Sequence, residues 1–142
     1  MNLQDRAGRT WTRSDFEGKS TFVTLWATWC GPCVEELPYI QKLYEQAKER
    51  PGVQVVTLNL DENPGKVGPF LAQHPFTFPV LMAKPYIDSM DPKERASVIP
   101  ENWIVDRNAV IREQAVGFDS RNPSKAGDAV KQILEKLLAP RQ

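Results

Sequence analysis

The stretch Trp-Ala-Thr-Trp-Cys-Gly-Pro-Cys at residues 26–33 constrains this chain most, because it holds both cysteines of the sequence, separated by two residues. The segment 21–27 is rich in β-branched and aromatic side chains and predicts a buried central strand. An amphipathic pattern follows the cysteines and predicts a helix. The cysteines therefore lie where a strand turns into a helix, and the free N–H groups and positive dipole end of a helix favour a thiolate there.

Cys30 and Cys33 fit a pair that exchanges disulfides. Cys30, at the outer edge of the turn, is expected to be the attacking thiol, and Cys33, one helical turn further in, is placed to resolve a mixed disulfide on Cys30. A zinc site needs four nitrogen or sulfur ligands, and two cysteines and one histidine cannot close one within a single chain. A purely structural disulfide remains an alternative, but so short a loop constrains the unfolded chain very little. We expect no metal, and no cofactor other than the redox-active Cys30-Cys33 disulfide.

The strand signals predict a parallel core that is followed by antiparallel strands, because strands and helices first alternate along the chain and a hairpin follows. The expected strands beside the central one are a hairpin within 3–12, single strands at 53–60 and 77–82, and a hairpin of 102–105 with 110–114 that Gly117 closes. Trp11 and Phe16 are interpreted as aromatic cover for the core.

Helical patterns fill the segments between these strands. The expected helices run from the cysteines to Pro51 with a kink at Pro38, from the loop at 61–65 to about Gln73, within 84–98 as a short helix plus loop, and from the N-cap Asn122 with Pro123 to Pro140. The apolar stripes of the first and last helix are Val34, Leu37, Ile40, Leu43 and Ala47, and Ala126, Val130, Ile133, Leu134 and Leu137.

The motif Trp29-Cys30-Gly31-Pro32-Cys33 between a strand and a helix resembles the active site of the thioredoxin superfamily. The wider string 22–38, which includes Glu36-Leu37-Pro38, is similar to the redoxin-like TlpA/ResA type of thiol-disulfide oxidoreductase. Further matches extend the resemblance over nearly the whole chain, at 8–11, 16–19, 78–80, Ile99-Pro100 and 103–106.

The resemblance implies an α/β, thioredoxin-like fold over one domain, residues 1–142, with a central mixed sheet flanked by helices. It also implies the N-terminal hairpin and an extra strand-helix insertion before a cis-proline at Ile99-Pro100. In such proteins this loop faces the cysteines, so that the backbone of Ile99 pairs with an extended substrate segment. The substrate-binding residues that follow are Trp29, Gly31, Pro32, Ile99 and Pro100. Glu101 departs from the family, which more often has threonine there.

Glu36 lies three residues after Cys33, on the same helical face, and is a candidate proton partner for Cys33 during resolution. Thioredoxins proper bury an acid six positions before the first cysteine, where this chain has Thr24, whereas the TlpA/ResA type has a glutamate at the place of Glu36. The alternative for Glu36 is a solvated charge on an exposed helix face. Trp29 is expected to contact substrates, and Trp26 to lie in the core on the side opposite Leu25.

His74, the one histidine, is a less suitable partner for a cysteine, because it lies in His74-Pro75 at the end of a helix, where C-terminal capping explains it. Lys plus Arg equals Asp plus Glu, at 18 each, so the charge balance indicates neither a nucleic-acid nor an anionic-membrane partner. No apolar run approaches the roughly 20 residues of a membrane span, and Met1 to Asp5 lacks a signal-peptide pattern, so we expect a soluble chain. We also expect a monomer.

The chain begins almost directly on its first expected strand, as a domain excised from a longer secreted, anchored or multidomain protein would. The resembled branch usually works outside the cytoplasm, in the periplasm or at a membrane anchor. That implies an extracytoplasmic location, although composition leaves a cytoplasmic one open. With both cysteines in the motif, no structural disulfide reports on the compartment.

The leading functional hypothesis is a protein-disulfide reductase that works through a Cys30 mixed disulfide. Its partners in the resembled branch are protein thiols, apocytochrome among them, and an upstream electron donor such as a membrane thiol reductase. The alternatives are a redox-sensing or docking module of a larger protein and a thiol peroxidase. Peroxidases of related folds use a cysteine in a Pro-Thr-x-x-Cys context, which this sequence lacks.

Overall fold

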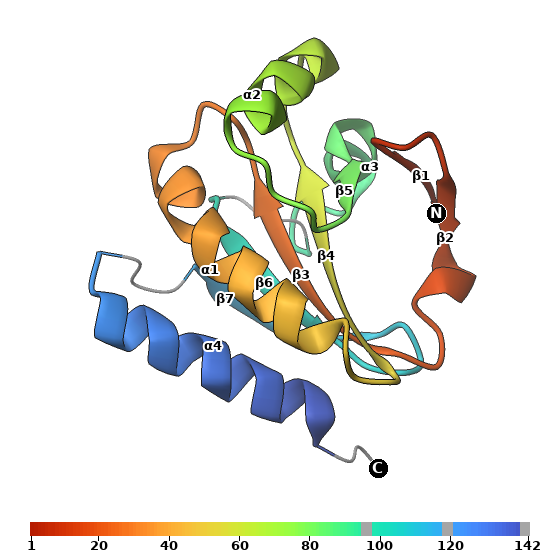
Figure 1. Ribbon diagram of the computed structural model, residues 1–142. Coiled ribbons are helices and arrows are strands. Elements are labelled where there is room, and N and C mark those ends of the chain that lie inside the picture. The colour runs from red at the N-terminus through yellow and green to blue at the C-terminus, as the bar shows by residue number, and fades with distance from the viewer. Residues whose placement is uncertain (95–97, 118–120, 140–142) are drawn as a thin grey trace.

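The computed structural model describes residues 1–94, 98–117 and 121–139, and within them seven strands form one mixed sheet (Figure 1). The spatial order is β2-β1-β5-β4-β3-β6-β7. The strands are β1 (Asn2–Asp5), β2 (Thr10–Thr12), β3 (Ser20–Trp26), β4 (Val53–Asn59), β5 (Val80–Met82), β6 (Glu101–Val105) and β7 (Ile111–Val116). β3, β4 and β5 are parallel, and the remaining pairings are antiparallel, which confirms the predicted parallel core and its hairpins.

Four α-helices and two short 3₁₀ turns accompany these strands in the described residues, and the last helix follows the last strand. They are η1 (Arg13–Asp15), α1 (Gly31–Ala47), η2 (Pro64–Lys66), α2 (Val67–Gln73), α3 (Lys84–Ser89) and α4 (Pro123–Leu138). α1 continues through Pro38 as one helix, and the kink there stays a prediction. Pro140 lies outside the described residues.

β5 is shorter than the predicted strand at 77–82, because its first residues bond elsewhere. The backbone N–H of Thr77 donates to the Gln41 side chain of α1 (2.9 Å), and Pro79 has no N–H to donate. The carbonyl of Pro79 still accepts from the N–H of Thr57 in β4 (2.9 Å). Ladder pairing with β4 therefore begins only at Val80.

The central strand β3 is buried along its whole length and sends its side chains alternately to two apolar layers. Phe22 and Trp26 pack in the layer that α1 and α4 cover, and Val23 and Leu25 pack in the layer beneath the N-terminal hairpin and α3. The prediction that Trp26 and Leu25 lie on opposite sides is confirmed. Trp11 and Phe16 are buried in the second layer, as expected.

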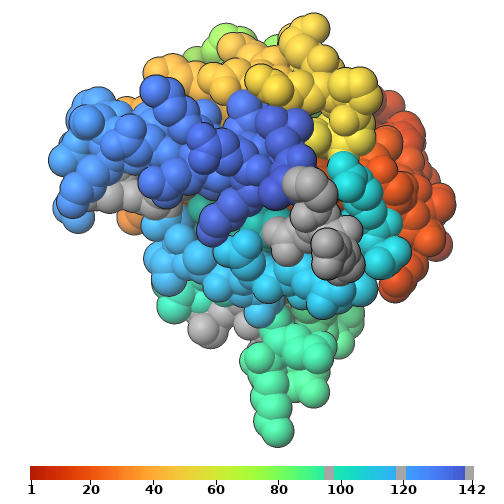
Figure 2. Space-filling view, turned by 90° about the horizontal axis from the view of Figure 1, so that it is seen from below, coloured from red at the N-terminus to blue at the C-terminus, as the bar shows by residue number. Residues whose placement is uncertain are grey.

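α4 packs beside α1, and Figure 2 shows α4 spread across the face seen from below. Its N-cap is Asn122, whose side chain accepts a hydrogen bond from the N–H of Lys125 (3.2 Å), as the sequence predicted. The predicted stripes of both helices are buried, except that Val34 and Ile133 are only partly so. None of the helices in the described residues is long and apolar enough to cross a bilayer.

A carboxylate closes the N-terminal hairpin. Asp5 accepts hydrogen bonds from the Trp11 indole N–H (2.9 Å) and from the backbone N–H groups of Ala7 (2.9 Å) and Arg9 (3.0 Å). The hydrogen bond from the Trp11 indole lowers the pKa of Asp5 below its ordinary value of 3.8, and this effect outweighs burial, which raises the pKa. The backbone hydrogen bonds and the charge of Arg9 lower the pKa further.

Acid is therefore expected to weaken this hairpin. Because the folded pKa is depressed, the contribution of Asp5 to stability is present above the unfolded pKa, about 3.9, and is lost as the pH falls through the folded value. Asp5→Asn should be less stable than the parent at pH 7, and the difference should shrink near pH 3. Urea unfolding of both proteins across this range measures it. A difference that is constant with pH would contradict the assignment.

Candidate active site

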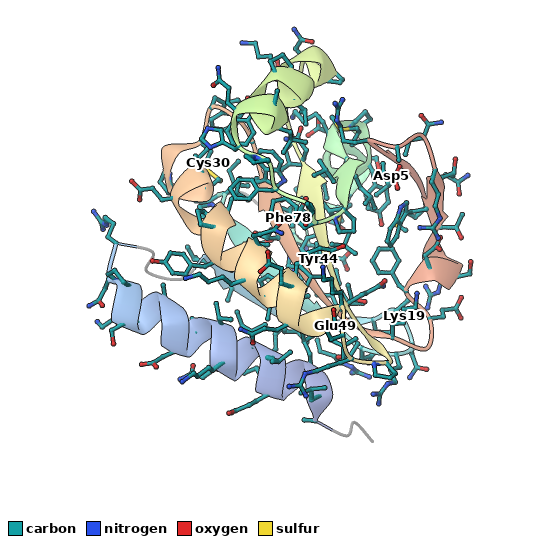
Figure 3. The ribbon with its side chains drawn as sticks, viewed as in Figure 1. Asp5, Lys19, Cys30, Tyr44, Glu49 and Phe78 are labelled. Carbon is teal, nitrogen blue, oxygen red and sulfur yellow. A yellow bond between two sulfur atoms is a disulfide. The ribbon has the colours of Figure 1, made fainter. Side chains whose placement is uncertain are left out.

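The cysteine turn joins β3 to α1. Cys30 is the N-cap of α1, which begins at Gly31 with Pro32 in its first turn, where the missing proline N–H costs no helical bond. Cys30 and Cys33 form a disulfide, and the N–H of Cys33 donates to the sulfur of Cys30 (3.2 Å). Figure 3 shows Cys30 at the N-terminal end of α1. The disulfide thus lies at the N-terminal end of a helix of 17 residues, which is the positive end of the helix dipole.

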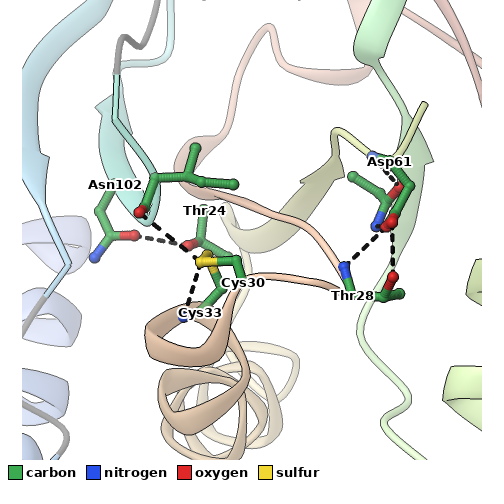
Figure 4. The surroundings of a disulfide bond; sticks show 8 residues. Thr24, Thr28, Cys30, Cys33, Asp61 and Asn102 are labelled. Atoms are coloured by element: carbon green, nitrogen blue, oxygen red, sulfur yellow. Dashed lines mark hydrogen bonds between the residues drawn. A yellow bond between two sulfur atoms is a disulfide. The ribbon is translucent and has the colours of Figure 1, made fainter.

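A loop far away in the sequence faces this turn. The Ile99-Pro100 bond is cis, as predicted, and the carbonyl oxygen of Ile99 lies 3.8 Å from the sulfur of Cys30 (Figure 4). The chain then enters β6, the neighbour of β3. The backbone of Ile99 therefore lies directly beside the sulfur of Cys30.

Exposure differs sharply along the turn. Trp29 is 69% exposed, whereas Cys30 and Cys33 are 5% and 1% exposed. Gly31 and Pro32 are also exposed and lie beside the sulfur pair in sequence. The disulfide is thus recessed below an exposed rim that carries a large aromatic side chain.

A groove of about 1090 Å³ leads away from the rim, between the loop after β4 and the α3 insertion. Trp29 and Ile99 line its end at the active site, and Val98, which is 64% exposed, lies next to Ile99. The remaining lining residues are Leu60, Asp61, Glu62, Asn63, Lys66, Lys84, Ile87, Asp88 and Pro92. The groove therefore offers apolar side chains at the rim and charges of both signs further along.

A buried carboxylate that the sequence analysis missed fixes the turn from the other side. Asp61, 3% exposed, accepts hydrogen bonds from the N–H (2.9 Å) and hydroxyl (2.6 Å) of Thr28 and from the side chain of Asn59 (2.8 Å) (Figure 4). Its own N–H donates to Asn59 (2.9 Å). These bonds tie the segment just before Trp29 to the end of β4.

Glu36 is buried, with 1% of its surface exposed, so the alternative of a solvated charge is wrong. The reason is that this face of α1 turns toward β6, where the side-chain amide of Asn102 donates to Glu36 Oε1 (2.8 Å). Cys33 lies one helical turn before Glu36 on the same face and is equally buried.

Asn102 also accepts a hydrogen bond from the hydroxyl of Thr24 in β3 (2.7 Å), and both residues are buried (Figure 4). The sequence singled out Thr24 only as a position without an acid, and no motif pointed to Asn102. Thr24 offered one signal, since it is a polar residue between Val23 and Leu25 in a strand that is buried along its whole length. Asn102 follows Glu101 at the start of β6 and offered no such signal.

Glu101 and His74 have structural partners. Glu101 stands where the family more often has threonine. Its carboxylate accepts a hydrogen bond from the Trp103 indole N–H (2.7 Å). His74 is the C-cap of α2, and its ring stacks on Phe70 with centroids 4.5 Å apart, in agreement with a capping role. Among the described residues, no group of three or more His, Cys, Asp or Glu side chains is placed to hold a metal ion.

These features define a class. A mixed sheet whose central strand runs into a Cys-Gly-Pro-Cys turn at a helix N-terminus, faced by a cis-proline loop, is the arrangement of thioredoxin-like proteins. The chain belongs to the Redoxin family, whose pattern matches residues 2–133.

Similar proteins agree with this assignment. The chain is 32% identical over 119 residues to the thiol-disulfide oxidoreductase ResA of Bacillus thuringiensis (strain Al Hakam), covering 84% of this chain and 67% of the relative. A crystal structure of a candidate thiol:disulfide interchange protein DsbE from Chlorobium tepidum has 31% identity and a TM-score of 0.73 over 96% of this chain and 92% of that one. The crystal structure of StoA from Bacillus subtilis, at 23% identity, shares the fold with a TM-score of 0.72 over 94% and 95% of the two chains.

Family, fold and disulfide-bonded pair together make this protein a thiol-disulfide oxidoreductase with a thioredoxin-like fold. The prediction of this class from the cysteine motif and the family resemblance is confirmed.

Proposed function

We propose that the protein reduces disulfide bonds in other proteins, with Cys30 as the attacking thiol and Cys33 as the resolving thiol. One observation supports this order most directly. The sulfur of Cys30 lies at the N-cap of α1, accepts a hydrogen bond from the N–H of Cys33 and lies beside the Ile99 carbonyl. Cys33, in contrast, lies inside the first turn of the helix and is almost fully buried. The helix end favours a thiolate at Cys30.

The reaction balances without a cofactor. The Cys30 thiolate attacks one sulfur of the substrate disulfide, forming a Cys30-substrate bond and releasing the other substrate sulfur as a thiolate. Cys33 then loses its proton and attacks the sulfur of Cys30, which breaks the mixed disulfide and releases the second substrate thiolate. The substrate gains two electrons and, with solvent protons, becomes a dithiol. The protein is left as the Cys30-Cys33 disulfide, which an upstream dithiol donor has to reduce.

Glu36 is proposed to accept the proton of Cys33 in the second step, because it is the buried carboxylate one turn further along the same helix. Glu36→Gln keeps the shape and removes the base, so resolution should slow on the order of 10²-fold while attack by Cys30 is nearly normal. DTNB, a small symmetric disulfide, separates the steps, since attack releases one coloured TNB thiolate and resolution releases another. Equal second-phase rates in both proteins would contradict the role of Glu36.

The rim and groove are proposed to bind the polypeptide on either side of the substrate disulfide. The backbone of Ile99, before Pro100, would pair with an extended segment by strand addition, and Trp29 would cover the apolar residues next to the substrate cysteine. Gly31 and Pro32 leave the approach to Cys30 free of large side chains. Trp29→Ala should lower kcat/KM for a protein disulfide about tenfold or more, and reactivity with DTNB much less. Equal losses with both substrates would contradict a docking role.

The physiological setting is part of the proposal. The site of action is proposed to be extracytoplasmic, with a membrane thiol reductase as electron donor and apocytochrome or other extracytoplasmic thiols as substrates. The ground for this is the resemblance to the TlpA/ResA branch, to which the ResA relatives, thiol-disulfide oxidoreductases by name, add support for the activity. The Gly31-Pro32 dipeptide is that of reducing thioredoxins and supports the reductive direction.

Insulin reduction in dithiothreitol tests the activity, with Cys30→Ser as the control. Equilibration with glutathione tests its direction, and we expect a reduction potential nearer that of thioredoxin, about −270 mV, than that of DsbA, about −120 mV. A value near the oxidising end would make the protein an oxidant, and no insulin reduction beyond the dithiothreitol background would overturn the proposed activity.

A further inference from the structure

Three buried polar side chains form a hydrogen-bonded line that ends at Glu36. Thr24 in β3 and Asn102 in β6 are 1% and 8% exposed, and Glu36 in α1 is 1% exposed. The Thr24 hydroxyl donates to Asn102 Oδ1 (2.7 Å), and Asn102 Nδ2 donates to Glu36 Oε1 (2.8 Å). A buried polar group has to be paired to avoid a desolvation cost, and this line pairs three of them with one another.

Strand register creates the first link. Thr24 and Asn102 are direct partners in the antiparallel β3-β6 ladder, so their side chains leave the sheet together on the same face. That face is the one covered by α1, because Phe22 and Trp26, two residues either side of Thr24, pack there. The register thus places the side-chain amide of Asn102 against α1, the helix that carries both Cys33 and Glu36.

The chemistry of the amide explains why Thr24 belongs to the line. With the Thr24 hydroxyl donating to its oxygen, the amide of Asn102 presents its N–H to Glu36, and an ionised carboxylate can only accept. A reversed amide would set its oxygen against Glu36 Oε1. The acceptor-only carboxylate of Glu36 therefore fixes which way the Asn102 amide faces, and the Thr24 hydroxyl, by donating to the amide oxygen, holds the amide in that orientation.

The other side of the Glu36 carboxylate is bounded by backbone. A Cβ atom added at Gly117 would lie 2.6 Å from Glu36 Oε2 and 2.5 Å from Cγ of Pro100. Glu36 is therefore confined between the Asn102 amide and the chain at Gly117, and a shift of Asn102 changes where the carboxylate can point.

We propose that Asn102 and Thr24 are positioning residues of the redox reaction, which hold the Glu36 carboxylate where it takes the proton of Cys33. This inference rests on the function proposed above. Asn102 acts through Glu36, and Thr24 acts through Asn102. Their effect falls on the resolving step, because attack by Cys30 on a substrate precedes the need for the Cys33 proton to leave.

Thr24→Val tests the outer link, because valine has the shape of threonine without the hydroxyl. We expect the second TNB phase to slow by roughly 3- to 10-fold and the first phase to change little, with Thr24→Ser restoring the second phase. The matched control is Thr57→Val. Thr57 is the register partner of Thr24 in β4, is equally buried, and donates to the Pro79 carbonyl (2.8 Å) instead. Equal slowing by Thr24→Val and Thr57→Val would reduce the effect to general destabilisation and overturn the proposal.

A double-mutant cycle tests the inner link. Asn102→Ala alone should slow the second phase by about tenfold, and in a Glu36→Gln background it should slow it no further, since no base remains to be positioned. Slowing by the same factor in both backgrounds would overturn the proposal, whereas Glu36→Gln without effect would overturn the proton role of Glu36 instead. If Asn102→Ala does not fold, which thermal unfolding reveals, the Thr24 variants decide the question alone.

Discussion

Cys30→Ser is expected to abolish disulfide exchange, and Cys33→Ser is expected to stop it after the first step, at the mixed disulfide. Without Cys30 no thiolate lies at the helix N-cap beside the Ile99 carbonyl, and Cys33 is too deeply buried to meet a substrate. Without Cys33 the first attack still proceeds and the mixed disulfide has no resolving thiol. With DTNB, the reduced parent should release two equivalents of TNB, Cys33→Ser one, and Cys30→Ser none on the same time scale.

Mass spectrometry of Cys33→Ser after the reaction should find one TNB group on Cys30. The decisive complementary measurement is alkylation of the reduced parent near neutral pH, where Cys30 should react much faster than Cys33. Equal rates at the two thiols would remove the assignment of attacking and resolving roles. The result would leave the fold and family of the protein untouched.

The sequence predicted those parts of the fold whose signals are local. The strand at Ser20–Trp26 and the stripes of α1 and α4 follow from alternation and helical periodicity, and the Asn122 cap from its own side chain. β5 was overestimated, because the N–H of Thr77 donates to the Gln41 side chain of α1, which no local pattern reports. The cis bond at Ile99-Pro100 was predicted from the family resemblance and from no local signal.

The candidate site was predictable in its sulfur chemistry and much less so in what surrounds it. Asp61 and its partner Thr28 are 33 residues apart, and Asn102 is 66 residues from Glu36, so these bonds depend on which strands become neighbours. Glu36 posed a different difficulty. A charged residue in a mixed helical stripe is usually solvated, and its burial becomes intelligible only when an amide on β6 is seen opposite.

Gly117→Ala is expected to disturb the site more than alanine at any other glycine of the chain, because the Pro100 ring and the Glu36 carboxylate occupy the space that the new Cβ would take. That atom would lie 2.5 Å from Cγ of Pro100, a ring that cannot rotate away, and 2.6 Å from Glu36 Oε2. The Gly117 N–H also donates to the Pro100 carbonyl (3.0 Å), so the chain here cannot simply retreat. Relief requires the Pro100 loop, the Glu36 side chain or both to move.

Overpacking of this kind costs about 1–3 kcal/mol, which for a chain of this size lowers Tm by roughly 3–10 °C. Both TNB phases should slow, the first because Ile99 moves with Pro100 beside Cys30 and the second because Glu36 is displaced. Gly127→Ala in α4 is the matched control, since its added Cβ meets nothing within 4 Å and alanine favours a helix. A Gly117→Ala protein with parental Tm and parental rates would show that neither Pro100 nor Glu36 needs the position it occupies, and would weaken the proton role of Glu36 together with the docking role of the loop.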